Sequence, residues 1–104
     1  MENQYLYKKE EIAFVLYNLN QEKIKYFLSI GRNSLREDFV LKCYDVARAF
    51  DFLDYLQQKI IIHLFFHKDS PGYISRKLNI EKDQIFYLKR NALRIILSTL
   101  NGQN

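Results

Sequence analysis

Apolar residues recur every three or four positions through most of this 104-residue chain, which is the period of an α-helix. The pattern predicts four helices followed by a closely spaced pair, over about residues 5–19, 21–30, 35–49, 52–66, 70–78 and 82–100. The third and fourth segments could also form one long helix with a bend. No strand is expected, because even the β-branched run Ile60-Ile61-Ile62 sits within a fifteen-residue stretch of helical spacing.

Capping residues predict where some of these helices begin and end. Gly31 is expected to stop the second helix. Ser34 or Asn33 is available to cap the third, and Glu37 stands three residues after Ser34, as in a capping box. Asp51 could cap the fourth helix.

The strongest local signals lie near the C-terminus. Ser70 is a good N-cap, and Pro71 suits the first helical position because it loses no needed hydrogen bond there. Asn79 tolerates the left-handed conformation that ends a helix in a tight turn, and Ile80 would then plug the turn into the core. A short helix, a tight turn and a second helix are the layout of a DNA-reading helix-turn-helix.

Composition agrees with a helical fold. Hydrophobic residues make up 48% of the chain, so a core can be buried, and three glycines and one proline are too few for a turn-rich β-sandwich or barrel. The length suits one compact domain. We therefore expect an all-α fold: a single domain over residues 1–104, forming a compact bundle of about five helices that ends in a helix-turn-helix.

Charge is distributed unevenly along the chain. Residues 1–66 contain nine Lys or Arg and nine Asp or Glu, so the whole net charge of +4 comes from residues 67–104. A local basic excess is what a module that meets phosphates shows, although a solvated basic face gives the same count. The cations of this segment are Lys68, Arg76, Lys77, Lys82, Lys89, Arg90 and Arg94.

The stretch from Leu53 to Leu100 resembles region 4 of bacterial sigma-70 factors. An apolar helix is followed by a Ser70-capped helix with Ile74-Ser75, a turn with an apolar plug at Leu78-Asn79-Ile80, and a helix that carries Ile85, Leu88, Ala92, Leu93 and Leu97. Asn79 stands where that family often has Gly, and Ser75 where it often has Ala. The resemblance covers about half of the chain, so residues 51–104 would be the region 4-like part and residues 1–50 an N-terminal helical extension. This layout is also similar to small phage late transcription regulators of the ArpU type.

The resemblance implies roles for the residues of the two C-terminal helices. Gln84 would read a base edge, since Gln pairs well with adenine in the major groove, and Tyr87 would contact a base or a thymine methyl. The basic side chains and the first helix's N-terminus would hold phosphates. The full set of expected DNA-binding residues is Ser70, Tyr73, Arg76, Lys77, Lys82, Asp83, Gln84, Phe86, Tyr87, Lys89 and Arg90.

No catalytic constellation stands out, and we expect neither an enzyme nor a cofactor. His63 and His67 have a spacing that can hold a metal, but the sequence does not choose between Asp69 and Cys43 as a third ligand. We therefore expect no metal site and interpret His63 as a core or edge residue. Cys43 is interpreted as a small buried hydrophobe. No signal peptide or membrane-length apolar run is visible, so a cytoplasmic location is expected.

These patterns predict a DNA-binding transcription regulator, encoded by a phage or mobile element, that acts at promoters through its C-terminal helix-turn-helix. Double-stranded DNA is the expected partner; RNA polymerase and a second copy of the chain are further candidates, and no membrane is expected. The alternative is a helical adaptor that binds a sigma factor or an RNA polymerase subunit without reading DNA. Aromatic residues on the exposed side of the last helix, Phe86 and Tyr87, would suit either function.

Overall fold

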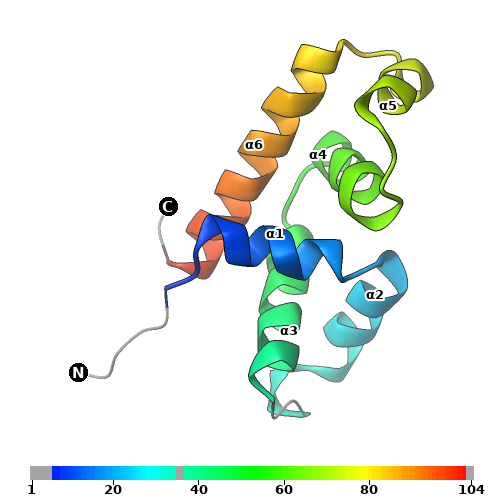
Figure 1. The fold of residues 1–104 in the computed structure, drawn as a ribbon. Coiled ribbons are helices and arrows are strands. Elements are labelled where there is room, and N and C mark those ends of the chain that lie inside the picture. Colours follow the sequence, from blue (N-terminus) through cyan, green and yellow to red (C-terminus); the bar gives the residue numbers. More distant parts are fainter. Residues whose placement is uncertain (1–5, 35–36, 103–104) are drawn as a thin grey trace.

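A computed structural model describes residues 6–34 and 37–102 (Figure 1). These residues form helices and no strand, so the all-α expectation is confirmed. The elements are α1 (Lys9–Tyr17), α2 (Gln21–Ile30), the 3-10 turn η1 (Arg32–Ser34), α3 (Asp38–Phe50), α4 (Tyr55–Ile61), the π-helical segment η2 (Ile62–Phe66), α5 (Pro71–Leu78) and α6 (Lys82–Leu100).

The long helix α6 packs against most of the other helices. It contacts α1 and α3 near one end and α4 and α5 near the other, so it connects the N-terminal and C-terminal parts of the chain (Figure 1). At about 1.5 Å per residue, its 19 residues span roughly 28 Å. The radius of gyration is 14.1 Å, close to the roughly 13 Å of a compact 100-residue domain, so the expected compact helical bundle is confirmed. No helix among the described residues is long and apolar enough to cross a membrane.

The boundaries of α2 follow its local signals. The Asn20 side chain accepts a hydrogen bond from the backbone N–H of Lys23 at 2.9 Å, which satisfies one free donor of the first turn. Gly31 ends the helix with φ of +78°, a conformation that side-chain-bearing residues rarely adopt. The predicted span of 21–30 is confirmed.

The first helix is shorter than expected. The predicted start, Tyr5, lies outside the described residues, and Leu6, Tyr7 and Lys8 are not helical. Tyr7 is held instead by α6's C-terminal neighbour: its N–H donates to Asn101 Oδ1 at 2.8 Å, and Asn101 Nδ2 donates to the Tyr7 carbonyl at 3.1 Å.

The Tyr7 side chain makes a further long-range contact. Its hydroxyl donates to Asp45 Oδ2 at 2.7 Å, and Arg32 pairs with Oδ1 of the same carboxylate at 2.6 Å. Burial, together with the bond to Asp45, raises the pKa of the Tyr7 phenol well above its usual value. These contacts join the segment before α1 to α3 and to the end of α6.

Two predictions about the caps of α3 and α4 are wrong. The helix α3 begins at Asp38 with an extended Glu37 at the N-cap position, so neither Asn33 nor Ser34 occupies the cap; the predicted start at Leu35 lies outside the described residues. Asp54 caps α4 in place of Asp51.

Asp54 displaces Asp51 because Gln57 completes a reciprocal capping box. Gln57 N donates to Asp54 Oδ1 at 2.8 Å, and Asp54 N donates to Gln57 Oε1 at 3.1 Å. The two helices are therefore separate, and α4 starts at Tyr55 rather than at Phe52.

The segment with the β-branched run stays helical, as expected, but its hydrogen bonding changes. Residues 62–66 form a π-helical turn, in which the N–H of His67 donates to the carbonyl of Ile62 at 2.9 Å, five residues earlier. Such turns are rare and occur frequently at functional sites.

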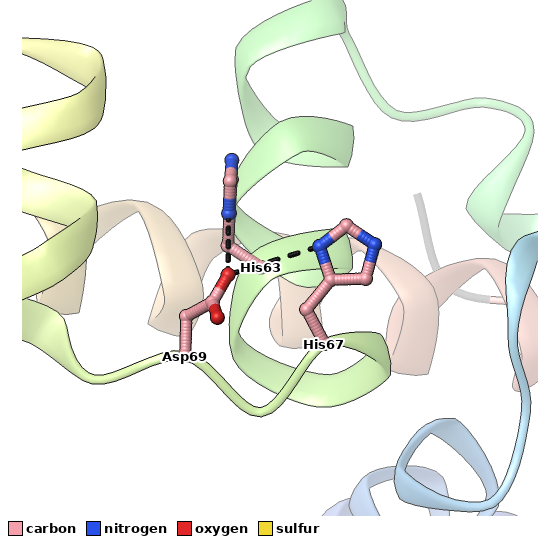
Figure 2. Close-up of side chains that lie close together, drawn as sticks. All are labelled: His63, His67 and Asp69. Carbon is pink, nitrogen blue, oxygen red and sulfur yellow. Dashed lines mark hydrogen bonds and ion pairs between the residues drawn. The ribbon is translucent and has the colours of Figure 1, made fainter.

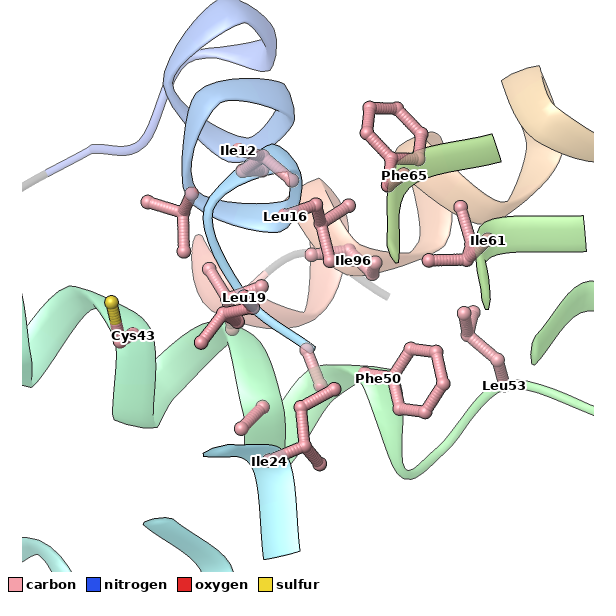
Figure 3. Packing of buried hydrophobic residues seen from close by; sticks show 14 of the residues in the cluster. Ile12, Leu16, Leu19, Ile24, Cys43, Phe50, Leu53, Ile61, Phe65 and Ile96 are labelled. Atoms are coloured by element: carbon pink, nitrogen blue, oxygen red, sulfur yellow. The ribbon is translucent and has the colours of Figure 1, made fainter. Parts of the chain in front are cut away.

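The main core lies where α1, α2, α3, the end of α4, η2 and α6 meet. Ile12, Leu16, Val46, Ile61 and Ile96 are fully buried there, and Figure 3 shows the side chains of this cluster converging from different helices. Truncating a residue of this kind to alanine costs about 2–5 kcal/mol. Cys43 belongs to the same cluster, so its interpretation as a buried small hydrophobe is confirmed; burial raises the pKa of its thiol.

Candidate nucleic-acid interface

The helix α5 starts where the sequence predicts. Ser70 has extended backbone angles (φ −76°, ψ 151°), and its hydroxyl oxygen accepts a hydrogen bond from the N–H of Tyr73 at 3.2 Å. Pro71 occupies the first turn. The Ser70 hydroxyl is exposed and retains its proton for donation to an outside acceptor.

The turn between α5 and α6 is narrow and tightly bonded. Asn79 has left-handed angles (φ 58°, ψ 50°), as expected for the end of α5. The N–H of Ile80 then donates to the Ser75 carbonyl at 3.2 Å, and the Ser75 hydroxyl donates back to the Ile80 carbonyl at 2.6 Å. Only Asn79, Ile80 and Glu81 separate the two helices.

A second, smaller core fixes the two helices against α4. Ile60 of α4, Ile74 of α5 and Ile85 of α6 are all fully buried in contact with one another. Four partly buried side chains surround them: Leu64, Leu78, Ile80 and Leu88. The prediction that Ile80 plugs the turn into the core therefore agrees with its packing, and the orientation of α5 relative to α6 is set by apolar contacts.

Most of the expected DNA-binding side chains point to solvent. Exposed residues on α5 and at its start are Ser70, Tyr73, Arg76 and Lys77; those on α6 are Lys82, Asp83, Gln84, Phe86, Tyr87 and Arg90. We call this set the α5–α6 face. Ile85 is buried between them, so the first turns of α6 expose one side and anchor the other.

Lys89 is set apart from the α5–α6 face. It is half-buried, and its ammonium lies 5.9 Å from the centre of the Phe65 ring. It lines a groove with Lys9, Glu10 and Ala13 of α1, and the more exposed Arg90 lines the same groove. Lys89 therefore contributes less to the exposed basic surface than its sequence position implies.

Lys68 also has an internal role that the sequence does not reveal. Its ammonium donates to the carbonyls of Tyr17 and Phe65, each at 3.2 Å, and lies 4.2 Å from the centre of the Tyr17 ring. These contacts tie the loop before α5 to the end of α1. The basic excess of residues 67–104 is thus partly structural.

Two cations converge at the start of α5. A β-carbon placed on Gly72 would lie 3.8 Å from both an Arg76 guanidinium nitrogen and the Lys82 Cε atom. Both side chains therefore bend toward the first turn of α5, where backbone N–H groups already favour an anion. Gly72 was not among the predicted site residues; the pattern Ser-Pro-Gly identifies a helix start, but the position of Lys82 beside it depends on the turn.

No ion pair within the described part of the chain neutralises Arg76, Lys77, Lys82 or Arg90. Their charge is available to a partner. The exposed aromatic rings Tyr73, Phe86 and Tyr87 lie on the same two helices. Charged donors and aromatic surface on one rigid element can bind phosphate groups and bases, or an acidic protein surface.

No family model matches this chain, and no curated protein or solved structure matches it either.

Proposed function

We propose that this chain is a DNA-binding transcription regulator that acts at promoters, with α5 and α6 serving as a helix-turn-helix. The observation that carries the proposal is the α5–α6 face. It has four exposed cations that form no ion pair with any described residue, on two helices held at a fixed angle by their own small core. In a helix-turn-helix the N-terminal residues of the second helix enter the major groove while the first helix contacts the backbone.

The exposed positions of α6 support this docking. Gln84 and Tyr87 are exposed in its first two turns, where base edges would lie. Arg90 continues the exposed side one turn beyond Phe86 and would meet a phosphate. Each base contact would contribute about 1–3 kcal/mol of discrimination.

The start of α5 supplies the backbone contact. Arg76 and Lys82 approach Gly72, and the exposed Ser70 hydroxyl caps the same turn. A DNA phosphate at this point would meet two cations, a hydroxyl donor and the positive end of a helix. Such contacts fix register on the duplex without reading sequence.

The resemblance to sigma-70 region 4 implies that the DNA target is a promoter and that the chain also contacts RNA polymerase. Residues 51–104 would form the region 4-like part and residues 1–50 the helical extension, as in small phage regulators of the ArpU type. Exposed aromatics on that extension, Phe14, Tyr17, Tyr26 and Phe39, give it a surface for RNA polymerase or for a second copy of the chain. Two copies on two half-sites would raise the affinity for DNA.

One observation favours the alternative, an adaptor that binds a sigma factor or a polymerase subunit without reading DNA. Asp83, Phe86 and Tyr87 give the leading end of α6 an acid and two large apolar surfaces, with Phe86 41% and Tyr87 52% exposed. Protein interfaces are enriched in such aromatics.

A salt titration separates the two functions. Binding of the chain to fluorescent duplex DNA, followed by anisotropy between about 50 and 200 mM salt, should give an affinity that falls linearly on a double-logarithmic plot. Lys82→Gln should weaken binding to every sequence and reduce the slope by about 1. Lys25→Gln, at an exposed position on α2, is the matched control and should change neither. Absence of binding even at low salt would leave the adaptor as the better account.

A further inference from the structure

His63, His67 and Asp69 form a cluster beside the π-helical segment (Figure 2). Asp69 Oδ2 lies 2.8 Å from His63 Nδ1 and 3.7 Å from His67 Nδ1. All three potential ligand atoms lie within 4.8 Å of one another. The figure shows the two rings on one side of the helix with the carboxylate facing both.

We propose that this cluster binds a divalent transition-metal ion, with Zn²⁺ the best fit. Imidazole nitrogen and carboxylate oxygen are preferred ligands of zinc, at about 2.0–2.2 Å from the ion. Tetrahedral geometry at those bond lengths separates ligand atoms by roughly 3.3 Å. The two distances from Asp69, 2.8 and 3.7 Å, lie on either side of that value, whereas the two histidine nitrogens lie up to 4.8 Å apart. Binding would therefore require the exposed His67 ring to rotate toward His63.

The surroundings of the cluster suit a cation. The His63 side chain is only 9% exposed and that of Asp69 25%, whereas that of His67 is 55% exposed. The ion would therefore have a shielded side and an open side, where water could provide a fourth ligand. The neighbouring cation in the sequence, Lys68, is directed elsewhere, because its ammonium is bonded to the carbonyls of Tyr17 and Phe65.

The structure also resolves a choice that the sequence leaves open. Asp69, rather than Cys43, is the third residue beside the two histidines, whereas Cys43 lies in the main core. An ion held by these ligands would join η2 to the loop that precedes Ser70. It would thereby restrict the start of α5, which places the metal site next to the α5–α6 face but not within it.

Isothermal titration of the chelator-treated full chain with ZnCl₂ tests the proposal without any DNA. We expect one saturable equivalent per chain and a rise in melting temperature on adding zinc, because a ligand that binds the folded state stabilises it. The exposed variant His67→Ala and the isosteric variant Asp69→Asn should each weaken the affinity by at least about tenfold. Circular dichroism of both variants would verify that they are folded.

Two control variants separate this site from other zinc ligands in the chain. Cys43→Ala removes the thiol, and Glu22→Gln removes an exposed carboxylate on α2; both variants should bind zinc as tightly as the unmodified chain. Absence of saturable binding by the unmodified chain would overturn the proposal. Equal affinity in His67→Ala or Asp69→Asn would also overturn it and would leave the bond between Asp69 and His63 as a structural contact only.

Discussion

Ser75 and Ile80 are joined by two hydrogen bonds of opposite direction across the turn between α5 and α6. The Ser75 hydroxyl donates to the Ile80 carbonyl at 2.6 Å, and the Ile80 N–H donates to the Ser75 carbonyl at 3.2 Å. The second bond is the long-range bond of a Schellman motif, in which the left-handed residue is Asn79. The bond from the Ser75 hydroxyl adds a side-chain contact across the same turn, so both ends of the turn are fixed before any partner binds.

Removing the Ser75 hydroxyl should loosen this turn. Ser75→Ala removes the donor to the Ile80 carbonyl, and we expect the free energy of unfolding to fall by about 1 kcal/mol, the usual contribution of one hydrogen bond. Urea denaturation followed by circular dichroism measures the change. Ser98→Ala, on α6 and remote from the turn, controls for the gain in helix propensity. A Ser75→Ala variant as stable as the control would show that the hydrogen bond from the Ser75 hydroxyl to the Ile80 carbonyl does not stabilise the fold.

The conformation of Asn79 gives a second stability prediction. Its φ of 58° places it in the left-handed region, which glycine enters freely and alanine does not. Asn79→Ala should therefore lower the free energy of unfolding by about 1–2 kcal/mol, whereas Asn79→Gly should leave it almost unchanged. Denaturation midpoints of the two variants measure the difference. If the alanine variant were as stable as the glycine variant, the left-handed conformation of Asn79 would be wrong.

The corrected cap of α4 can be tested with a matched pair of variants. Asp54→Ala removes the side chain that accepts from Gln57 N, and loss of an N-cap costs about 1 kcal/mol. Asp51→Ala, three residues earlier, removes an exposed carboxylate that does not cap the helix and should change stability by less than about 0.5 kcal/mol. Thermal unfolding of both proteins provides the comparison. The reverse order of effects would restore Asp51 as the cap.

Base reading by α6 predicts a loss of sequence preference when its exposed polar residues are removed. Duplexes selected from a random pool should bind the unmodified chain better than scrambled ones, and Gln84→Ala and Tyr87→Ala should each reduce that difference by about 1–3 kcal/mol. Lys82→Gln should instead weaken binding to both duplexes equally, since it would contact a phosphate. Competition assays against both duplexes measure these ratios. An unchanged preference in both alanine variants would remove Gln84 and Tyr87 from the reading positions even if DNA binding persisted.

The sequence predicted those boundaries that depend on neighbouring residues. Gly31 ends α2, Ser70 starts α5 and Asn79 ends it, and each does so through its own backbone conformation or side-chain bond. The span of α6 was also correct, because its apolar spacing continues without interruption to Leu100. Local signals were sufficient at these positions.

Other helix boundaries depend on contacts between residues far apart in the sequence, or on a choice between two residues that are equally suitable as caps. Tyr7 is held outside α1 by Asn101, 94 positions away, which no local pattern reveals. Asp51 and Asp54 both suit an N-cap, and the Gln57 side chain decides between them. The same reason applies to the candidate site: the basic excess was visible in the sequence, but the internal contacts of Lys68 with distant carbonyls were not.

The most direct test of the central claim, that the α5–α6 face binds DNA, is a residue-by-residue map of the contact. Backbone amide resonances of the isotope-labelled chain should be followed by NMR as duplex DNA is added at low salt. We predict that the changes concentrate at the start of α5 and over Lys82–Arg90, while the amides of α2 and α3 keep their positions. Changes confined to α1, α2 and α3, or no change at any residue, would contradict the claim.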